Sequence, residues 1–109
     1  MNSEKANLFS NLPDGSKTEI IEKLHEQSGI LIERILSNGQ TTLEGEWYDQ
    51  ETDEWVLVLR GSGKLLFEGN REQTLNQGDY LFIPRHTKHR VTFTDLNTIW
   101  LAIHISDSK

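Results

Sequence analysis

The sequence of 109 residues has no cysteine, only two prolines and a single methionine. The absence of cysteine excludes disulfide bonds, thiolate metal ligands, iron–sulfur clusters and cysteine nucleophiles, and it is typical of a cytoplasmic protein. Basic residues are also scarce, since 11 lysines and arginines stand against 17 aspartates and glutamates and leave a net charge of −6. Because nucleic-acid affinity comes largely from cationic side chains that neutralise phosphates, we expect no nucleic-acid partner.

The sequence also lacks long apolar segments. No run approaches the ~18 apolar residues of a membrane-spanning helix. The first ten residues, MNSEKANLFS, do not combine a cationic segment with an apolar one. We therefore expect no membrane partner and no export signal. A chain of this length accommodates one domain, with a core and one small pocket.

The N-terminal part of the chain predicts an arm followed by a helix. Residues 1–15 have no sustained hydrophobic period, and we expect them to form an arm. Ser16 and Glu19 have the spacing of a capping box, a pair of side chains that satisfies backbone donors at a helix start. Apolar residues then share one face until Gly29, a residue suited to end a helix. The pattern predicts a short helix over residues 16–28.

From residue 30 the hydrophobic pattern changes to that of strands. Turn residues separate short apolar and β-branched runs, which cover residues 30–36, 41–49, 54–60, 63–68, 72–75, 79–84, 89–94 and 98–105. The segments 55–59 and 80–83 are apolar on both faces, so we expect these strands to be buried on both sides. The sequence therefore predicts an all-β domain over 16–109, with a barrel over 30–105 behind the short N-terminal helix.

Two segments carry the candidate chemistry. Strand alternation places Glu54 and Val56 on one face, and a carboxylate that faces a barrel interior needs a partner because an isolated buried charge is costly. In the second segment Gly78 starts an apolar strand, Pro84 ends it and His89 opens the next strand.

Both segments resemble the motifs of the cupin superfamily. Glu54 and Gly61 match the end of its first motif, a glutamate followed by six residues and a glycine. The second motif is matched at three positions, which are Gly78, Pro84 and His89. His86 stands where that motif usually has glycine, and Phe93 where it often has asparagine. The resemblance implies a small single-domain cupin with the jelly-roll β-barrel of that family, which is often dimeric.

The sequence departs from the family at the start of the first motif. In metal-binding cupins, two histidines one residue apart precede the glutamate, and with it and the second-motif histidine they hold Mn, Fe, Ni or Zn. Here a four-residue spacing puts Trp47 and Asp49 in those places, and a three-residue spacing puts Tyr48 and Gln50 there. Neighbours on a strand point to opposite faces, so at most one of Asp49 and Gln50 faces inward. We favour Asp49, which keeps the commoner spacing and offers an oxygen ligand.

Two interpretations of Glu54 and His89 stay open. In the first, Asp49, Glu54 and His89 form a divalent-metal site with open positions for water or substrate. In the second, Glu54 and His89 form a metal-free hydrogen-bonded pair in the barrel mouth, in which the carboxylate stabilises the imidazolium.

Further candidates for the pocket are Tyr48, Gln50, His86 and His104. Tyr48 is either packed at the barrel edge or a hydrogen-bond donor to a ligand. His86 is either a solvated loop residue or a contact for an anionic ligand, because basic residues surround it. His104 is either a satisfied core histidine or a further nitrogen donor of the same cavity.

These residues predict a cytoplasmic cupin that binds a small polar or anionic molecule in the barrel mouth. If the protein is an enzyme, the resemblance implies metal-assisted oxygenation, isomerisation or lyase chemistry, in which Glu54 or His89 moves a proton. The alternatives are a non-catalytic metabolite-binding or sensor module without metal, and a structural domain that only dimerises. We expect a homodimer, for which Leu8 and Phe9 of the arm are candidate contacts.

Overall fold

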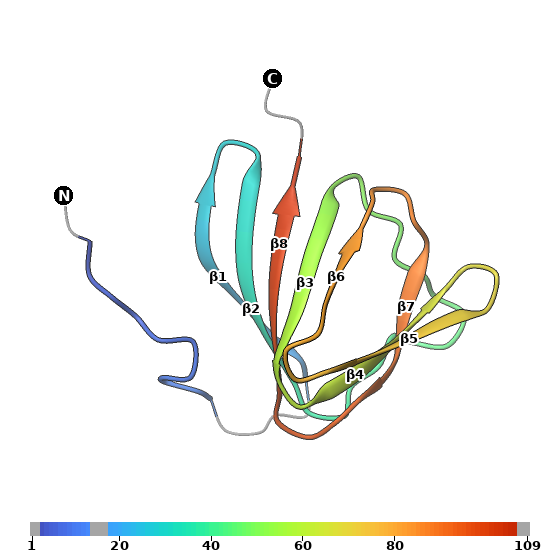
Figure 1. Cartoon of the computed structure of the whole chain (residues 1–109), viewed down its shortest axis with the longest axis horizontal. Coiled ribbons are helices and arrows are strands. Elements are labelled where there is room, and N and C mark those ends of the chain that lie inside the picture. Colours follow the sequence, from blue (N-terminus) through green and yellow to red (C-terminus); the bar gives the residue numbers. More distant parts are fainter. Residues whose placement is uncertain (1–2, 14–17, 107–109) are drawn as a thin grey trace.

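The computed structural model describes residues 3–13 and 18–106 (Figure 1). Within these residues the chain forms eight strands: β1 (Ile20–Gln27), β2 (Ile30–Ser37), β3 (Asp53–Arg60), β4 (Ser62–Phe67), β5 (Arg71–Asn76), β6 (Tyr80–Ile83), β7 (His89–Thr94) and β8 (Thr98–Ile105). A five-stranded sheet has the order β1-β2-β8-β3-β6, and a three-stranded sheet has the order β5-β4-β7. The expected all-β class is confirmed.

The predicted helix over residues 16–28 is wrong, because the described part of this segment forms β1. β1 pairs antiparallel with β2 along its length. The turn between them contains Gly29 at a φ of 80°, which glycine adopts without strain. A helix of this length is marginal by itself, whereas the strand gains its hydrogen bonds from β2. Ser16 of the predicted capping box lies outside the described residues, and no described segment is a helix long and apolar enough to cross a membrane.

The other expected strands agree with the structure apart from two features. Residues 41–49 form no strand and contribute only a β-bridge between Tyr48 and His89. The run 80–83 forms β6, but it is not buried on both sides, since Tyr80 and Phe82 are 66% and 52% exposed. Their side of the five-stranded sheet points away from the other sheet. Strand alternation, rather than apolar composition, therefore decides which side chains are buried.

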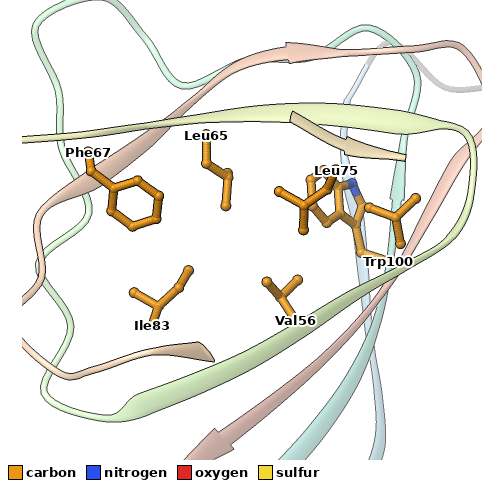
Figure 2. Close-up of a cluster of buried hydrophobic side chains, with 7 residues drawn as sticks. Val56, Leu65, Phe67, Leu75, Ile83 and Trp100 are labelled. Atoms are coloured by element: carbon orange, nitrogen blue, oxygen red, sulfur yellow. The ribbon is translucent and has the colours of Figure 1, made fainter. Parts of the chain in front are cut away.

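The hydrophobic core lies between the two sheets. Figure 2 shows Phe67 and Leu65 of β4 on one side of the cluster and Ile83 of β6 and Val56 of β3 on the other, with Trp100 at one end. The Trp100 indole packs so closely on Gly63 that a Cβ at residue 63 would overlap two carbons of the ring. Burying each large apolar side chain contributes ~1.5–3 kcal/mol. This packing fixes the distance between the sheets and leaves a cavity beside the core.

The N-terminal arm is attached to the outward side of the five-stranded sheet. Arg34 of β2 is only 6% exposed. Its guanidinium donates hydrogen bonds to the backbone oxygens of Leu8 and Ser10, at 3.0 and 2.9 Å, and pairs with Glu22 at 2.7 Å. A buried cation needs such partners. The arm therefore supplies two of the acceptors that make the burial of Arg34 tolerable.

Candidate functional site

A cavity of about 130 Å³ lies between the two sheets, beside the core. Much of its wall is apolar and formed by Ile21, Ile35, Val56, Leu65, Ile83, Val91 and Trp100. The polar side chains that line it are Glu19, Glu33, Tyr48, Gln50, Glu54, His89 and His104. The volume is below the ~300–1,000 Å³ of pockets for drug-sized ligands, so this cavity suits a small molecule.

A second cavity, of about 250 Å³, lies where the arm meets the β1, β2 and β8 ends. Although it is larger, Arg60 is the only ionisable side chain among the described residues that line it. General acid–base chemistry needs ionisable side chains that converge on one ligand. The smaller cavity has several, among them Glu54 and His89, and is therefore the candidate site.

The structure brings Glu54 and His89 together in this cavity. Their strands belong to different sheets, β3 and β7, so the two side chains meet across the space between the sheets. The Glu54 Oε1 and His89 Nε2 atoms are 3.9 Å apart, with side-chain exposures of 11% and 5%. This distance is too long for a direct hydrogen bond. Each group therefore keeps hydrogen-bonding capacity that a small molecule in the cavity can use.

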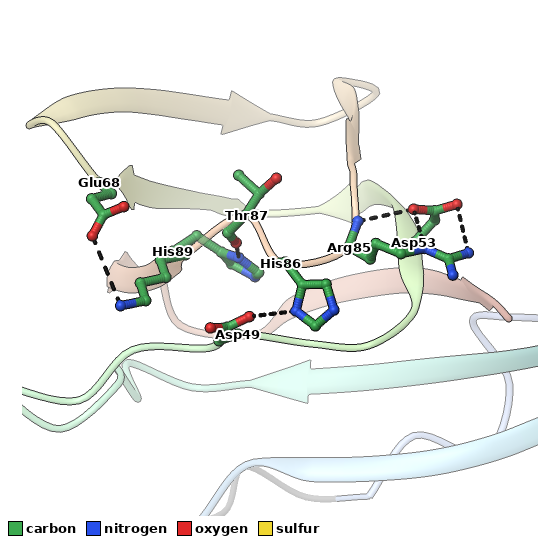
Figure 3. A network of polar contacts seen from close by, with 8 residues as sticks. Asp49, Asp53, Glu68, Arg85, His86, Thr87 and His89 are labelled. Carbon is green, nitrogen blue, oxygen red and sulfur yellow. Dashed lines mark hydrogen bonds and ion pairs between the residues drawn. The ribbon is translucent and has the colours of Figure 1, made fainter.

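The other ring nitrogen of His89 fixes the protonation pattern of the imidazole. His89 Nδ1 lies 2.8 Å from the backbone oxygen of Thr87, as Figure 3 shows. A carbonyl oxygen only accepts hydrogen bonds, so Nδ1 carries the proton. In the neutral ring, Nε2 is then an acceptor that faces Glu54 and the cavity.

Burial raises the pKa of Glu54 above its usual value of 4.5. Desolvation is the largest cause, because the low-dielectric cavity disfavours the charged carboxylate. The nearby imidazoles of His104 and His89 lower the pKa, and the Glu33 carboxylate raises it. The net upward direction brings the titration of Glu54 closer to neutral pH, which suits a group that both takes and returns a proton.

A second carboxylate–imidazole pair lines the same cavity. Glu33 Oε1 lies 3.0 Å from His104 Nε2, with side-chain exposures of 18% and 15%. His104 therefore lines the cavity, but its Nε2 is satisfied by Glu33, as the interpretation of a satisfied core histidine requires. Sequence analysis did not identify Glu33, although a lone carboxylate inside an apolar strand is the same signal that identified Glu54.

Tyr48 and Gln50 line the cavity, whereas Asp49 does not. Asp49 points the other way, and its Oδ1 lies 3.0 Å from Nδ1 of His86, with both side chains exposed (Figure 3). The preference for Asp49 over Gln50 as the inward residue is thereby corrected. Of the two interpretations of His86, the solvated loop residue is the one that agrees with its exposure. Successive side chains of an extended segment alternate, so bringing Tyr48 and Gln50 inward turns Asp49 outward.

The segment of Tyr48 and Gln50 is fixed by backbone hydrogen bonds although it forms no strand. The Tyr48 amide donates to the His89 oxygen at 2.7 Å, and the His89 amide donates back at 3.1 Å. The His86 amide donates to the Gln50 oxygen at 2.8 Å.

Burial raises the pKa of the Tyr48 phenol, and the charge of Glu19 is the next largest cause of this rise. Tyr48 therefore stays a neutral hydrogen-bond donor at neutral pH.

The cavity does not fit the metal-ligand set of the family. At the spacing that the structure favours, Tyr48 and Gln50 replace the two histidines, and both are weaker ligands than imidazole for late first-row metals. Across residues 3–13 and 18–106, no three histidine, cysteine, aspartate or glutamate side chains are grouped so that they could hold a metal ion. The predicted metal site of Asp49, Glu54 and His89 is not assembled, since Asp49 points away from the cavity.

The fold agrees with the family to which the sequence belongs. A family model described as a cupin domain matches residues 35–104. The chain therefore belongs to the cupin family. Its fold is the double-stranded β-helix, as in a cupin from Methanocaldococcus jannaschii that is 14% identical, with a TM-score of 0.69 and coverage of 90% of this chain and 88% of that one.

Two other proteins are more similar to this chain in sequence. A crystal structure from Ralstonia eutropha JMP134, provisionally described as a mannose-6-phosphate isomerase, is 42% identical and has a TM-score of 0.91, with 96% of this chain and 100% of that one covered. An uncharacterized protein of Aquifex aeolicus (strain VF5) is 37% identical over 62 residues. That match covers 57% of this chain and 50% of the Aquifex protein, so it spans only half of that relative's length.

Proposed function

We propose that this cupin binds a small neutral hydroxy-carbonyl compound in the cavity between its sheets and catalyses proton transfer on it without a metal. The observation that supports this proposal is the buried Glu54–His89 pair, in which the Glu54 Oε1 and His89 Nε2 atoms are 3.9 Å apart. Two groups at this separation can both contact one ligand atom at ordinary hydrogen-bond distance from each, ~2.8 Å. The pair therefore offers one acid–base carboxyl and one acid–base imidazole to the same molecule.

The lining favours a neutral ligand over an anionic one. Three carboxylates line the cavity, from Glu19, Glu33 and Glu54, and no lysine or arginine is among the described residues around it. A phosphorylated sugar needs cationic or backbone donors at its phosphate, and the volume of about 130 Å³ leaves little room for one. The Ralstonia relative, provisionally described as a mannose-6-phosphate isomerase, supports isomerisation as the reaction class. The phosphate of that name is not part of the proposal, because the described lining of this cavity has no lysine or arginine to bind it.

An aldose–ketose isomerisation uses these groups without any co-reactant. Glu54, as the carboxylate, takes the proton from the carbon beside the carbonyl and returns it to the neighbouring carbon. His89 Nε2 accepts the proton of the adjacent hydroxyl and returns it to the former carbonyl oxygen. Tyr48 donates a hydrogen bond to that oxygen as negative charge develops. Protons and electrons balance, and the carboxyl and imidazole end in their starting states.

The test is exchange of carbon-bound hydrogen with solvent. Glyceraldehyde and dihydroxyacetone, an aldose–ketose pair of small size, are incubated with untagged protein in D₂O, and deuterium incorporation is followed by NMR. We expect exchange that depends on Glu54, with Asp49→Asn as the matched control outside the cavity. Binding of either compound without exchange would support the non-catalytic binding module instead. Stoichiometric Mn, Fe, Ni or Zn in the protein, measured by elemental analysis, would contradict the metal-free site.

A further inference from the structure

Residues 43–47 form a loop whose two ends are fixed to the same strand, β7. At its start, the Thr42 amide donates to the Val91 oxygen, and the Val91 amide donates to the Thr42 hydroxyl, both at 2.9 Å. At its end, Tyr48 and His89 exchange backbone hydrogen bonds. The loop therefore leaves β7 at one residue and returns to it two residues away, with a single residue of the strand between the two attachment points.

Arg90 is that single residue, and its side chain spans the loop. It lies opposite Leu66 of β4, on the outer face of the three-stranded sheet, which is the face away from the cavity. Its Nη2 donates to the backbone oxygens of Thr42 and Leu43, at 3.3 and 3.4 Å. Its guanidinium carbon lies 5.8 Å from the centre of the Trp47 ring, within the range of a cation–π contact. One side chain thus contacts both the beginning and the end of the loop.

Stability alone does not explain why an arginine occupies this position. The Nε atom of Arg90 is buried and has no hydrogen-bond partner among the described residues. A buried donor without a partner is costly, and groups that break a local rule in this way are concentrated at functional sites. Arg90 follows His89 directly in the chain and holds the loop that leads into Tyr48. Its contacts therefore bear on the cavity although its side chain lies outside it.

The contact between Arg90 and Trp47 bears on which side chains of the next residues face the cavity. Because Trp47 is held on the outer face, strand alternation turns Tyr48 inward. Asp49 then points outward and Gln50 inward, as the structure shows. A shift by one residue would reverse all of these directions. It would bring Trp47 and Asp49 to the cavity, the pair that the four-residue spacing selects.

We propose that Arg90 is a positioning residue of the site: it holds Trp47 on the outer face and thereby selects the register in which Tyr48 and Gln50 face the cavity. In this register the Tyr48 and His89 rings have their centroids 5.6 Å apart. The consequence for proton transfer rests on the proposed function, because it needs the Tyr48 phenol to donate to the ligand. The selection of the register does not rest on it.

NMR of the full chain tests the register without using activity. In the wild type we expect nuclear Overhauser effects between the ring protons of Tyr48 and those of His89. Arg90→Ala should remove them, because the loop is no longer held at both ends. The Trp55 and Tyr80 rings, with their centroids 5.4 Å apart, provide a reference within the same spectrum and should keep their effects in every variant. Circular dichroism and thermal melts verify that each variant is folded.

Two more variants separate the register from a general weakening of the sheet. Trp47→Ala removes the other partner of the contact and should remove the same effects. The Trp47 side chain is partly exposed, at 41%, so the fold tolerates its loss better than that of a core residue. Lys64→Ala is the matched control, since it removes a cation that lies 5.8 Å from the Phe93 ring on the same sheet. It should leave the effects unchanged.

Deuterium exchange tests the consequence for the site. A misplacement of about 1 Å can cost ~100-fold in rate, so we expect Arg90→Ala to lower exchange by at least about 10-fold. Tyr48→Phe should also lower it, and Arg90→Ala/Tyr48→Phe should be no slower than the slower single variant. The two changes remove one and the same interaction, so their effects should not add.

The outcomes distinguish this inference from the proposed function. Tyr48–His89 effects that persist in folded Arg90→Ala or Trp47→Ala would overturn the inference, and so would their equal loss in Lys64→Ala. Lost effects with undiminished exchange would also overturn it. If the effects are lost as expected but the wild type itself catalyses no exchange, the register role of Arg90 is supported and the proposed function is refuted.

Discussion

The two carboxylate–imidazole pairs of the cavity differ in the distance between the carboxylate oxygen and the ring nitrogen. Glu33 and His104 are 3.0 Å apart and satisfy each other, whereas Glu54 and His89 are 3.9 Å apart and do not. The closed pair can stabilise the fold without a ligand. The open pair has unused hydrogen-bonding capacity in a buried place, which is costly unless something else uses it. The same two chemical groups thus serve stability at one position and ligand binding at the other.

The difference follows from where the strands lie. Glu33 and His104 come from β2 and β8, neighbouring strands of one sheet, and they sit diagonally across the ladder because His104 is opposite Leu31. Diagonal neighbours are within reach of long side chains. Glu54 and His89 come from different sheets, so core packing sets their separation. The pair within one sheet is therefore at hydrogen-bond distance, and the pair between the two sheets is not.

The largest expected effect is on proton transfer. Glu54→Gln keeps the shape of the side chain but removes the base, and we expect deuterium exchange to fall by at least about 100-fold, the lower end of general acid–base contributions. NMR of the carbon-bound hydrogens measures this. Glu33→Gln, which changes the closed pair in the same way, should lower exchange by less than about 10-fold. Equal losses in the two variants would show that the open and closed pairs do not differ in role.

The next largest effect is on the free energy of unfolding. We expect a loss when the Glu33–His104 pair is changed and no loss when the Glu54–His89 pair is changed. Glu33→Ala leaves His104 without its partner, and we expect the free energy of unfolding to fall by about 1.5–3 kcal/mol, the range for a hydrogen bond to a charged group. Urea denaturation monitored by tryptophan fluorescence measures it. Glu54→Gln should instead leave stability at neutral pH unchanged or higher, because it removes a charge that the cavity disfavours. A larger loss for Glu54→Gln than for Glu33→Ala contradicts the comparison.

The pH dependence of stability distinguishes Glu54 from its neighbour Asp53. The pKa of Glu54 is raised by burial, so the folded chain holds this proton where the unfolded chain has released it. Stability therefore falls as pH rises from the usual value of 4.5 through the raised value, by about 1.4 kcal/mol for each pKa unit between the two states. Denaturation of wild type and Glu54→Gln across this range should show the loss in wild type only.

Asp53 should behave in the opposite sense. Hydrogen bonds from the backbone amide and side chain of Arg85 lower the pKa of Asp53 below its usual 3.8. Its contribution to stability is therefore present above the usual value and is lost as pH falls through the lowered value. Asp53→Asn should remove a loss that wild type shows at acid pH. If both variants changed the pH profile in the same direction, the opposite environments of these adjacent carboxyls would be refuted.

The smallest effect is expected outside the cavity. Asp49 and His86 form an exposed pair, and such pairs contribute ~0–1 kcal/mol. Asp49→Asn should change the free energy of unfolding by less than about 0.5 kcal/mol and deuterium exchange by less than about 2-fold, within the usual range for surface substitutions. The same urea and NMR measurements check it. A loss of exchange comparable to that of Glu54→Gln would return Asp49 to the site.

Much of the cavity was predictable because strand alternation is local. The apolar run around Glu54 fixed its inward face, and the turn and proline before His89 fixed the strand that carries it. Tyr48 and Gln50 were candidates, but the choice between Gln50 and Asp49 depended on backbone pairing with residues 86–89, far along the chain. No local pattern encodes such a pairing. The helix expected over 16–28 failed for the same reason, since its alternative was pairing with β2.

The sequence by itself determined the family, the all-β class and the inward position of Glu54, because periodicity and motif spacing depend only on neighbouring residues. Only the tertiary structure decided that β1 is a strand, that Gln50 rather than Asp49 lines the cavity, and that Glu33 closes on His104. These outcomes depend on distances between strands far apart in the chain. Side-chain packing between the sheets sets those distances, and it is a property of the whole core.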